Sequence, residues 1–224
     1  MDISSLNEIF KPLSPLRRMQ ELYRHFDESE VLVTSSFGTT SAYLLHLIQR
    51  VRPTQPIYFI DTTYHFPETL AYRDQLADQL NLNIISLRPD QHLNAYTREN
   101  KTWAHDPDLC CSVNKNDTLS PLKMRHKVWV SGVMGYQTPL REQLNIFEQN
   151  DIIKFHPVLN STEADVRRYT SYFRLPPHPL QAKDYHSIGC VHCTQQGTGR
   201  SGRWAGKGKI ECGLHAPVEK SMVA

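Results

Sequence analysis

Short apolar runs alternate with longer amphipathic segments from residue 31 to about residue 160. This alternation is typical of strands and helices that follow one another in a parallel sheet. The sequence therefore predicts an α/β fold, an open parallel sheet with flanking helices. The apolar runs predict strands at residues 31–34, 57–60, 83–87, 127–130 and 152–155.

Three amphipathic segments predict helices between or after these strands. Residues 40–51 place five apolar side chains on one helical face, and residues 67–80 open with a proline, which is favoured in a first turn. Residues 161–173 follow the last strand, with Ser161 or Thr162 as N-cap. Because the first two helices each join two strands, we expect right-handed crossovers.

The pattern changes at both ends of this region. Residues 1–30 predict a helical segment that covers a sheet edge, with an interface in a homo-oligomer as the alternative. Residues 195–209 are rich in Gly and Arg and offer almost no apolar side chains, so residues 185–224 are expected to form a mobile tail draped over the sheet. The chain thus divides into residues 1–30, an α/β domain of residues 31–184, and a tail of residues 185–224.

Composition and charge narrow the function classes. The chain has 224 residues, 25 Lys and Arg and 23 Asp and Glu, so its formal net charge of +2 gives no electrostatic footprint for nucleic acid. The longest uncharged stretch, residues 31–49, is broken by polar side chains and does not predict a membrane span. The first residues lack the basic start and apolar run of a signal peptide, so a reducing cytoplasm is the expected compartment.

Two segments after predicted strands carry candidate binding residues. The first strand ends in TSSFGTTSA, which holds Ser35, Ser36, Phe37, Gly38 and Thr39. Such a loop entering a helix offers N–H groups and hydroxyls to a phosphate, although it is neither a Rossmann nor a Walker loop and can equally be a polar connection.

Asp61 directly follows the second predicted strand. A carboxylate at the carboxyl end of a parallel strand can bind ribose hydroxyls or a cation. Its alternative role is to cap the helix that begins at Pro67. The sequence leaves these two roles open.

Five cysteines form an uneven set. Cys110 and Cys111 are adjacent, and Cys190 and Cys193 form a Cys-X-X-Cys segment. Adjacent cysteines do not easily reach relaxed disulfide geometry, so the two pairs favour one metal centre over two bridges. Zinc and iron–sulfur fit this ligand count equally, and buried free thiols beside a redox Cys-X-X-Cys are the remaining alternative.

The fifth cysteine, Cys212, lies in RSGRWAGKGKIECGLH. The positive charges of Arg200, Arg203, Lys207 and Lys209 favour its thiolate, as His215 does when it is protonated, while the neighbouring Glu211 opposes it. The glycines before it give the segment freedom to move. The segment therefore predicts a mobile nucleophile, with a spare cysteine in a frayed tail as the alternative.

Taken together, the segments SSFG, DTTYHFPET, CC, GC-x-x-CT and the terminal GRW…ECGLH resemble the assimilatory sulfonucleotide reductases over residues 30–215. The resemblance implies an adenine-nucleotide α-hydrolase-like fold in which residues 31–184 bind the nucleotide. It implies reduction of adenosine 5′-phosphosulfate (APS), or of its 3′-phosphorylated form (PAPS), to sulfite, with thioredoxin or glutaredoxin as the electron donor.

The resemblance also assigns roles to residues. Four cluster positions filled by cysteine imply a 4Fe–4S cluster and the APS-using branch. Cys212 corresponds to the nucleophile that forms an S-sulfocysteine, and Lys115 to the lysine between cluster and substrate. The residues expected to bind substrate are Ser35, Ser36, Phe37, Gly38, Thr39, Asp61, Lys115, Arg141, Arg200, Arg203 and His215, and those expected to bind the cluster are Cys110, Cys111, Cys190 and Cys193.

Three positions depart from the family pattern. Met134 and Gly135 stand where two adjacent arginines are usual, and Thr63 stands where glycine is usual. The loss of two arginines removes charge-assisted contacts worth about 1.5–3 kcal/mol each if they bind substrate. A reductase of PAPS, or of both nucleotides, is therefore the first alternative, and a nucleotide-binding or sulfur-transfer relative without reductase activity is the second.

Overall fold

Six strands form one sheet in the order β3–β2–β1–β4–β6–β5 in the computed structural model, which describes residues 2–215. The strands are β1 (Val31–Thr34), β2 (Ile57–Ile60), β3 (Ile84–Leu87), β4 (Val128–Val130), β5 (Phe147–Gln149) and β6 (Ile153–Phe155). All neighbouring pairs are parallel except β5 and β6, which are antiparallel. The predicted α/β class and its five strands are confirmed.

The pattern missed β5, the strand at one sheet edge. Its sequence, Phe-Glu-Gln, holds a single apolar residue, so no apolar run marks it. It exists because β6 offers it a pairing edge, where Phe147 lies opposite Phe155. The sheet is therefore mostly parallel rather than wholly so.

Alternation of side chains along the strands divides the core between the two faces of the sheet. On one face Val31 and Val33 of β1 join the larger core beneath the helices α1, α2, α3, α4 and α10. On the other face Leu32 and Trp129 join Leu119 of α8 in a smaller core. Helices on both faces are what a parallel sheet requires, since its strands are apolar on both sides.

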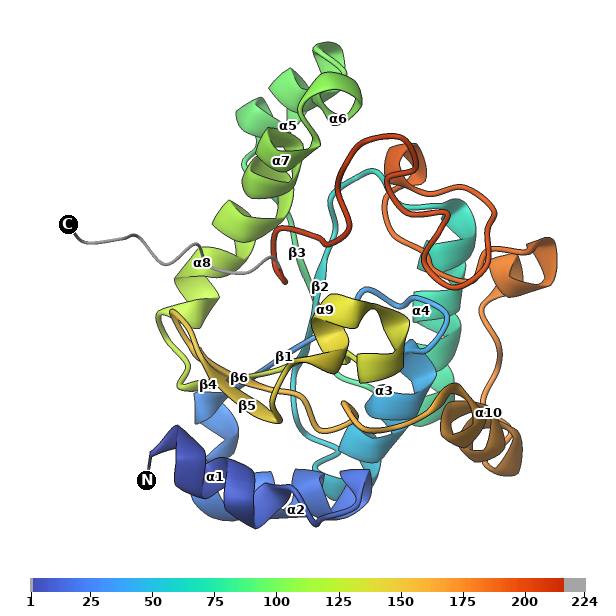
Figure 1. Cartoon of the computed structure of the whole chain (residues 1–224). Helices are drawn as coiled ribbons and strands as arrows, with labels where there is room; N and C mark the ends of the chain where they lie inside the picture. Colours follow the sequence, from blue (N-terminus) through green and yellow to red (C-terminus); the bar gives the residue numbers. More distant parts are fainter. Residues whose placement is uncertain (1, 216–224) are drawn as a thin grey trace.

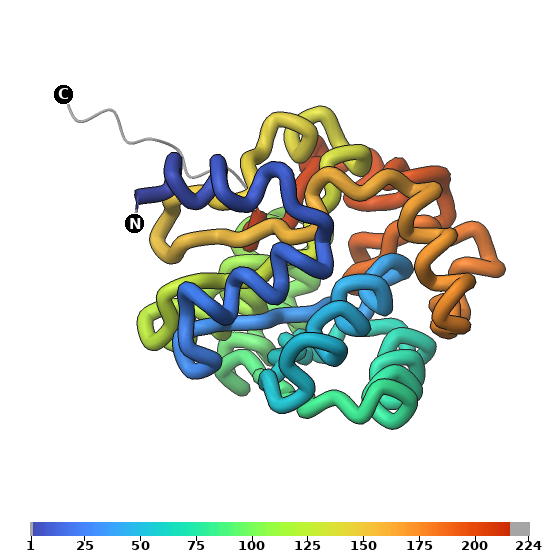
Figure 2. Tube along the Cα trace, turned by 90° about the horizontal axis from the view of Figure 1, so that it is seen from below, coloured from blue at the N-terminus to red at the C-terminus, as the bar shows by residue number. Residues whose placement is uncertain are grey.

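The helices of the larger face are α1 (Ile3–Phe10), α2 (Pro15–His25), α3 (Ser41–Val51), α4 (Pro67–Leu80) and α10 (Glu163–Tyr172). Figure 2 shows α1 and α2 running across the sheet near its β5 edge, and the amide of Asn7 bonds the backbone of Phe147 in β5. Between Asp2 and Glu30 the chain thus forms two helices and a 3-10 turn (Glu28–Glu30), and α1 contacts the edge strand β5.

On the other side of the sheet, a column of short helices connects β3 to β4 (Figure 1). It consists of α5 (Gln91–Glu99), α6 (Thr102–His105), α7 (Pro107–Cys111), a π-helical turn (Ser112–Asn116) and α8 (Asp117–Lys123). After β4 come a 3-10 turn (Gly135–Gln137) and α9 (Pro139–Glu142). The column and α9 both reach the carboxyl ends of the central strands.

The last part of the chain, residues 185–215, forms what we call the C-terminal arm. It holds only one 3-10 turn, Val191–Cys193, and runs between α4 and the α5–α8 column in Figure 1. Trp204 gives it a buried anchor, with 2% of its surface exposed. No helix in residues 2–215 has the length and apolar character to cross a bilayer.

Candidate active site

A cavity of about 570 Å³ lies at the carboxyl ends of β1 and β4, where the arm covers it. The loop after β1, the segment after β4 and the arm supply most of its walls. The predicted substrate residues that line it are Ser35, Ser36, Gly38, Thr39, Lys115, Arg141, Arg200, Arg203 and His215. Cys212 also lines it, so the structure brings residues from five distant segments to one chamber.

The loop after β1 is folded by its own side chains. Ser35 Oγ accepts a hydrogen bond from the backbone N–H of Phe37, and Phe37 takes a positive φ of 49°. That conformation turns the Phe37 ring into the core against Phe59, so Phe37 is not among the cavity-lining residues. Thr39 Oγ1 donates to the carbonyl of His186, which ties the loop to the arm.

Asp61 lies directly after β2, as expected, but is not among the residues that line the cavity. Its carboxylate accepts a hydrogen bond from the N–H of Thr63 and pairs with Arg88 at 3.4 Å. Thr63 itself has a φ of 65°, which glycine adopts more easily than a β-branched residue. Its hydroxyl bonds Asn94 and Arg98, which hold it in place.

Cys212 is the nucleophile candidate, and its surroundings favour the thiolate. Lys115 Nζ lies 3.6 Å from its Sγ. The adjacent Cys111, and after it the charges of Lys115 and Arg203, lower the pKa of Cys212 well below its ordinary value, against the opposing effect of burial. A thiol held in this form at neutral pH can attack an electrophile.

Lys115 is presented by the π-helical turn between α7 and α8. Burial alone would lower the pKa of its ammonium, but the neighbouring Cys190, Cys212 and Cys111 raise it overall. Lys115 therefore remains a cation between the four-cysteine region and the cavity.

Arg203 is held mainly by backbone oxygens. Its Nη1 donates to the carbonyl of Ile188 and its Nε to that of Cys193, while its guanidinium lies 4.2 Å from the Trp204 ring centre. No carboxylate pairs with it among residues 2–215. Its positive charge therefore acts on Cys212 and on the other cysteines nearby, Cys190, Cys193 and Cys111.

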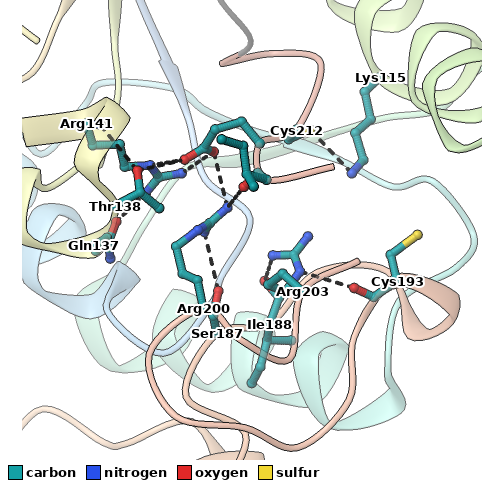
Figure 3. A network of polar contacts seen from close by, with 12 residues as sticks. Lys115, Gln137, Thr138, Arg141, Ser187, Ile188, Cys193, Arg200, Arg203 and Cys212 are labelled. Carbon is teal, nitrogen blue, oxygen red and sulfur yellow. Dashed lines mark hydrogen bonds and ion pairs between the residues drawn. The ribbon is translucent and has the colours of Figure 1, made fainter. Parts of the chain in front are cut away.

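Arg141 and Arg200 point toward the same place in Figure 3, and a carboxylate lies between them. Glu211 Oε1 accepts from Arg141 Nε at 2.7 Å, and Glu211 Oε2 accepts from Arg141 Nη2 at 2.8 Å and from Arg200 Nη2 at 3.1 Å. The pKa of Arg200 is lowered to about 10, first by burial and then by the charge of Arg141, while Glu211 opposes the shift. Sequence reasoning treated Glu211 only as opposing the thiolate and missed this contact.

His215 ends the described chain inside the molecule. Its ring stacks on Trp129, with centres 5.6 Å apart, and Lys154 bonds the carbonyl of the preceding Leu214. Burial and nearby cations, Arg141 first among them, lower the pKa of His215 well below its ordinary value. It is therefore neutral at pH 7 and adds no positive charge beside Cys212.

The other four cysteines are buried near Lys115. Cys110 and Cys190 pack together beside Tyr64, and burial, with Cys190 and Cys193 adding to it, raises the pKa of Cys110 to about 11. Cys190 Sγ lies 3.4 Å from the hydroxyl of Thr62, and Asn114 donates to Cys110 Sγ at 3.7 Å. Thiols whose thiolates are disfavoured by burial need a metal to become anionic ligands.

Within residues 2–215 no three His, Cys, Asp or Glu side chains are grouped so as to hold one metal ion. A single zinc would require that grouping, since four sulfurs would each lie about 2.3 Å from the same ion. In a 4Fe–4S cluster each cysteine binds a different iron, so the sulfurs are farther apart. The four buried cysteines are thus candidate ligands, and their arrangement in residues 2–215 does not distinguish zinc from an iron–sulfur cluster.

Met134 and Gly135 occupy the two positions where the family pattern has adjacent arginines, and neither residue is charged. Met134 is 1% exposed and belongs to the larger core. A side chain at Gly135 would place its Cβ 3.2 Å from the carbonyl of Leu159. The structure thus gives both positions a packing role, and the cations that line the cavity are Lys115, Arg141, Arg167 and those of the arm.

Four further cavity residues were not among the predicted site residues. Ser131 and Gly132 follow β4, and Tyr136 and Gln137 follow in the next turn. The Ser131 hydroxyl has no partner among the described residues, and the Gln137 side chain bonds Arg141. Gly132 and Gln137 match the family segment that also holds Arg141, whereas Ser131 and Tyr136 had only their position after a strand end as a cue.

Curated proteins of similar sequence cover most of this chain. The curated adenosine 5′-phosphosulfate reductase of Chelativorans sp. (strain BNC1) is 39% identical over 201 residues, which are 87% of this chain and 82% of that protein. The enzyme of the same name from Bacillus cereus (strain Q1) is 35% identical over 221 residues, 94% of each chain.

Solved structures support the fold. The phosphoadenylyl-sulfate reductase of Candida auris, in a phosphate complex, superposes with a TM-score of 0.74 at 24% identity over 86% of this chain and 96% of that one. An NH3-dependent NAD synthetase from Campylobacter jejuni gives a TM-score of 0.53 at 16% identity, over 78% and 75% of the two chains. The adenine-nucleotide α-hydrolase-like fold expected from the sequence is confirmed.

The family model described as the phosphoadenosine phosphosulfate reductase domain matches residues 30–196. This span holds the sheet, the loop after β1 and all four paired cysteines, and it ends shortly before Arg200. By both the family model and its relatives, the chain belongs to the phosphoadenosine phosphosulfate reductase family.

Proposed function

We propose that this protein reduces adenosine 5′-phosphosulfate to sulfite and AMP with thioredoxin as electron donor, in assimilatory sulfate reduction. The observation that carries the proposal is the position of Cys212 Sγ at the cavity, 3.6 Å from Lys115 Nζ. The relatives of 35–39% identity are named for this activity. The cavity, the arm and the cations around Cys212 are what such a reaction needs.

The first step is attack of the Cys212 thiolate on the sulfur of the substrate. A sulfur–sulfur bond forms, the bond between sulfur and the bridging phosphate oxygen breaks, and AMP leaves with that electron pair. Anionic oxygens shield the sulfur, so the attack needs cations that neutralise them as the phosphate departs. Lys115, Arg200 and Arg203 supply these charges, and the loop Ser35–Thr39 offers N–H groups and hydroxyls to the phosphate.

The second step regenerates Cys212. One thiolate of thioredoxin attacks Cys212 Sγ, a mixed disulfide forms, and sulfite leaves with the electron pair of the old sulfur–sulfur bond. The second thiol of thioredoxin then attacks its own partner sulfur and releases Cys212 as a thiolate. The electrons for sulfite come from the two thiols, which leave as a disulfide. Glutaredoxin is the alternative donor.

Cys110, Cys111, Cys190 and Cys193 are the proposed ligands of a 4Fe–4S cluster. Their burial and the adjacent Lys115 support this assignment. When bound, the cluster supplies fixed charge and a covalent staple between the α5–α8 column and the arm. We place the protein in the cytoplasm, where thioredoxin keeps thiols reduced.

Reduction of PAPS, alone or beside APS, is the second candidate. Its support is the family model for the phosphoadenosine phosphosulfate reductase domain over residues 30–196 and the similar fold of the Candida auris phosphoadenylyl-sulfate reductase. A relative that binds a nucleotide without reducing it is disfavoured by the position of Cys212 beside Lys115, because binding alone needs no activated thiol.

Anaerobically purified protein incubated with APS or PAPS and reduced thioredoxin tests the proposal. We expect sulfite and AMP from APS at a far lower substrate concentration than the PAPS reaction requires. No sulfite from either nucleotide would rule out both reductase functions. Cys193→Ser should lose the brown chromophore of the cluster, whereas Cys212→Ser should keep it; a chromophore unaffected by Cys193→Ser would refute the ligand assignment.

A further inference from the structure

Glu211 is a buried carboxylate next to the nucleophile, and it has partners on two different segments. Its side chain is 3% exposed. Arg141 of α9 binds both carboxylate oxygens, and Arg200 of the arm binds one of them. Thr138, at the start of α9, lies 3.4 Å from Oε1. The carboxylate thus joins the end of the arm to a helix that follows β4.

Arg141 and Arg200 have no other carboxylate partner among the described residues that could replace Glu211. Arg200 has weaker contacts at 3.4 Å with Ser187 Oγ and the Ile210 carbonyl, and its Nε has no partner among the described residues. Without the Glu211 charge, two buried guanidinium groups would face one another uncompensated. Removing one partner of a buried charge cluster is costly because the remaining charges stay desolvated.

The two arginines also line the cavity. They carry two positive charges against the one negative charge of Glu211, so the cavity retains an attraction for an anion. An anionic ligand that approaches Arg141 and Arg200 shares them with Glu211. The protein's own carboxylate therefore occupies part of the cationic site.

We propose that Glu211 is the positioning residue that seats Cys212, and that it does so by holding the same two arginines that a sulfonucleotide anion would contact. The seated arm places Cys212 against Lys115, while the arginines are partly neutralised before substrate arrives. Loss of the Glu211 charge should loosen the arm and free the arginines for the ligand. Only the predictions for kcat and KM rest on the proposed function.

The test compares Glu211→Gln, which keeps the shape and removes the charge, with Glu211→Asp, which keeps the charge. Glu142→Gln is the matched control, since Glu142 is exposed on the same helix as Arg141. The readouts are amide hydrogen exchange of residues 205–215 without ligand, the affinity for AMP by titration calorimetry, and kcat and KM for APS. All variants are purified anaerobically as the full chain.

For Glu211→Gln we expect arm exchange to rise about tenfold, AMP to bind about two- to tenfold more tightly, and kcat to fall at least about tenfold while KM falls or stays unchanged. Glu211→Asp should recover most of the exchange protection, and Glu142→Gln should match the wild type. A merely structural role for Glu211 would weaken AMP binding and raise KM together with the loss of kcat.

Unchanged arm exchange in Glu211→Gln, or weaker AMP binding, would overturn the proposal. Failure of Glu211→Asp to recover protection would also overturn it, because charge would then not be the cause. If Glu211→Gln does not fold, Glu211→Asp is the test variant. Its amide exchange rate in the arm should be faster than that of the wild type but slower than that of an unprotected segment. An arm without any protection from exchange would contradict the inference. A wild type that makes no sulfite refutes the proposed function, while exchange and AMP affinity still decide the role of Glu211.

Discussion

The central sheet and the C-terminal arm are held by different kinds of interaction. All three residues of β4 are buried, and the strand pairs with neighbours on both sides. Trp204 is the largest apolar anchor of the arm, and Ile188 is buried beside it in sequence. Most other contacts of the arm are polar: arginines bind carbonyls and Glu211, and lysines bind the carbonyls of Trp103 and Leu214. The sheet is thus stabilised by apolar burial over many residues, and the arm mainly by polar contacts.

This difference separates two functions within one chain. A segment with few apolar contacts can open locally at a free energy well below that of global unfolding. The proposed reaction needs such a segment, because Cys212 must first reach a covered cavity and then meet a second protein. The sheet needs no such freedom, since it only fixes the positions of the loops. Variants of the two regions should therefore affect different measurements.

The largest expected effect is on activity, from the arm. Cys212→Ser removes the nucleophile and should lower sulfite formation from APS by at least about a thousandfold. The midpoint of urea unfolding should stay unchanged, because the serine replaces one sulfur in a segment outside the sheet. Turnover near the wild-type rate would mean that another thiol attacks the sulfur.

The next effect is on stability, from the sheet. Phe155 in β6 is fully buried against Phe10 and Phe147. Phe155→Ala should lower the free energy of unfolding in urea by about 3–5 kcal/mol. Phe155→Leu, which leaves a smaller cavity, should cost less, and equal losses in both variants would contradict the cavity explanation.

A third variant tests whether the arm opens alone. Trp204→Ala removes the arm's apolar anchor and the ring beneath Arg203. Hydrogen exchange of residues 197–215, which follow the proposed ligands Cys190 and Cys193, should rise at least about tenfold, while the free energy of global unfolding should change by less than about 1 kcal/mol. A global loss as large as that of Phe155→Ala would show that arm and sheet unfold as one unit.

The smallest expected effect concerns pH. Burial lowers the pKa of His178 to about 4, with Glu68 opposing the shift, and its ring bonds the N–H of Leu180 and the hydroxyl of Thr69. An unfolded histidine titrates near pH 6.5, so the unfolded state binds more protons between these values. Stability contributed by neutral His178 should therefore be full above pH 6.5 and decline as pH falls toward 4.

Urea unfolding between pH 7 and 4.5 measures this decline. His178→Gln should reduce the pH-dependent loss by about 1–2 kcal/mol relative to the wild type. The arm's exchange pattern at pH 7 should stay unchanged, since His178 precedes the arm. A pH profile identical in both proteins would mean that other groups cause the acid sensitivity.

Much of the sheet could be predicted from the sequence because its strands are apolar on both faces. β1 and β2 begin and end where the apolar runs do. β5 could not be predicted, since one phenylalanine beside Glu148 and Gln149 forms a strand only when a partner edge is present. The pattern of apolar residues predicts a strand from the side chains that it buries, and an edge strand of three residues such as β5 buries few of them.

The site residues could be predicted where a motif marked them, but not where only their position in a loop did. Cys212 and Lys115 could be placed from motifs, and the structure brings them together. Phe37 and Asp61 were chosen by position in a loop, and neither lines the cavity, because the positive φ of Phe37 turns its ring inward and Arg88 binds Asp61. The role of Glu211 depends on Arg141, 70 residues earlier in the chain, and no local pattern links the two.

The π-helical turn at Ser112–Asn116 has a consequence for how the α5–α8 column tolerates change. It holds more residues per turn than the α-helices on either side, so it shifts the phase of every side chain that follows. Deleting one residue there would restore an unbroken α-helix and rotate α8 by about 100°. Leu119 would leave its place against Trp129, and Lys115 would leave Cys212. The length of this turn is therefore a structural constraint in its own right, independent of which amino acids occupy it.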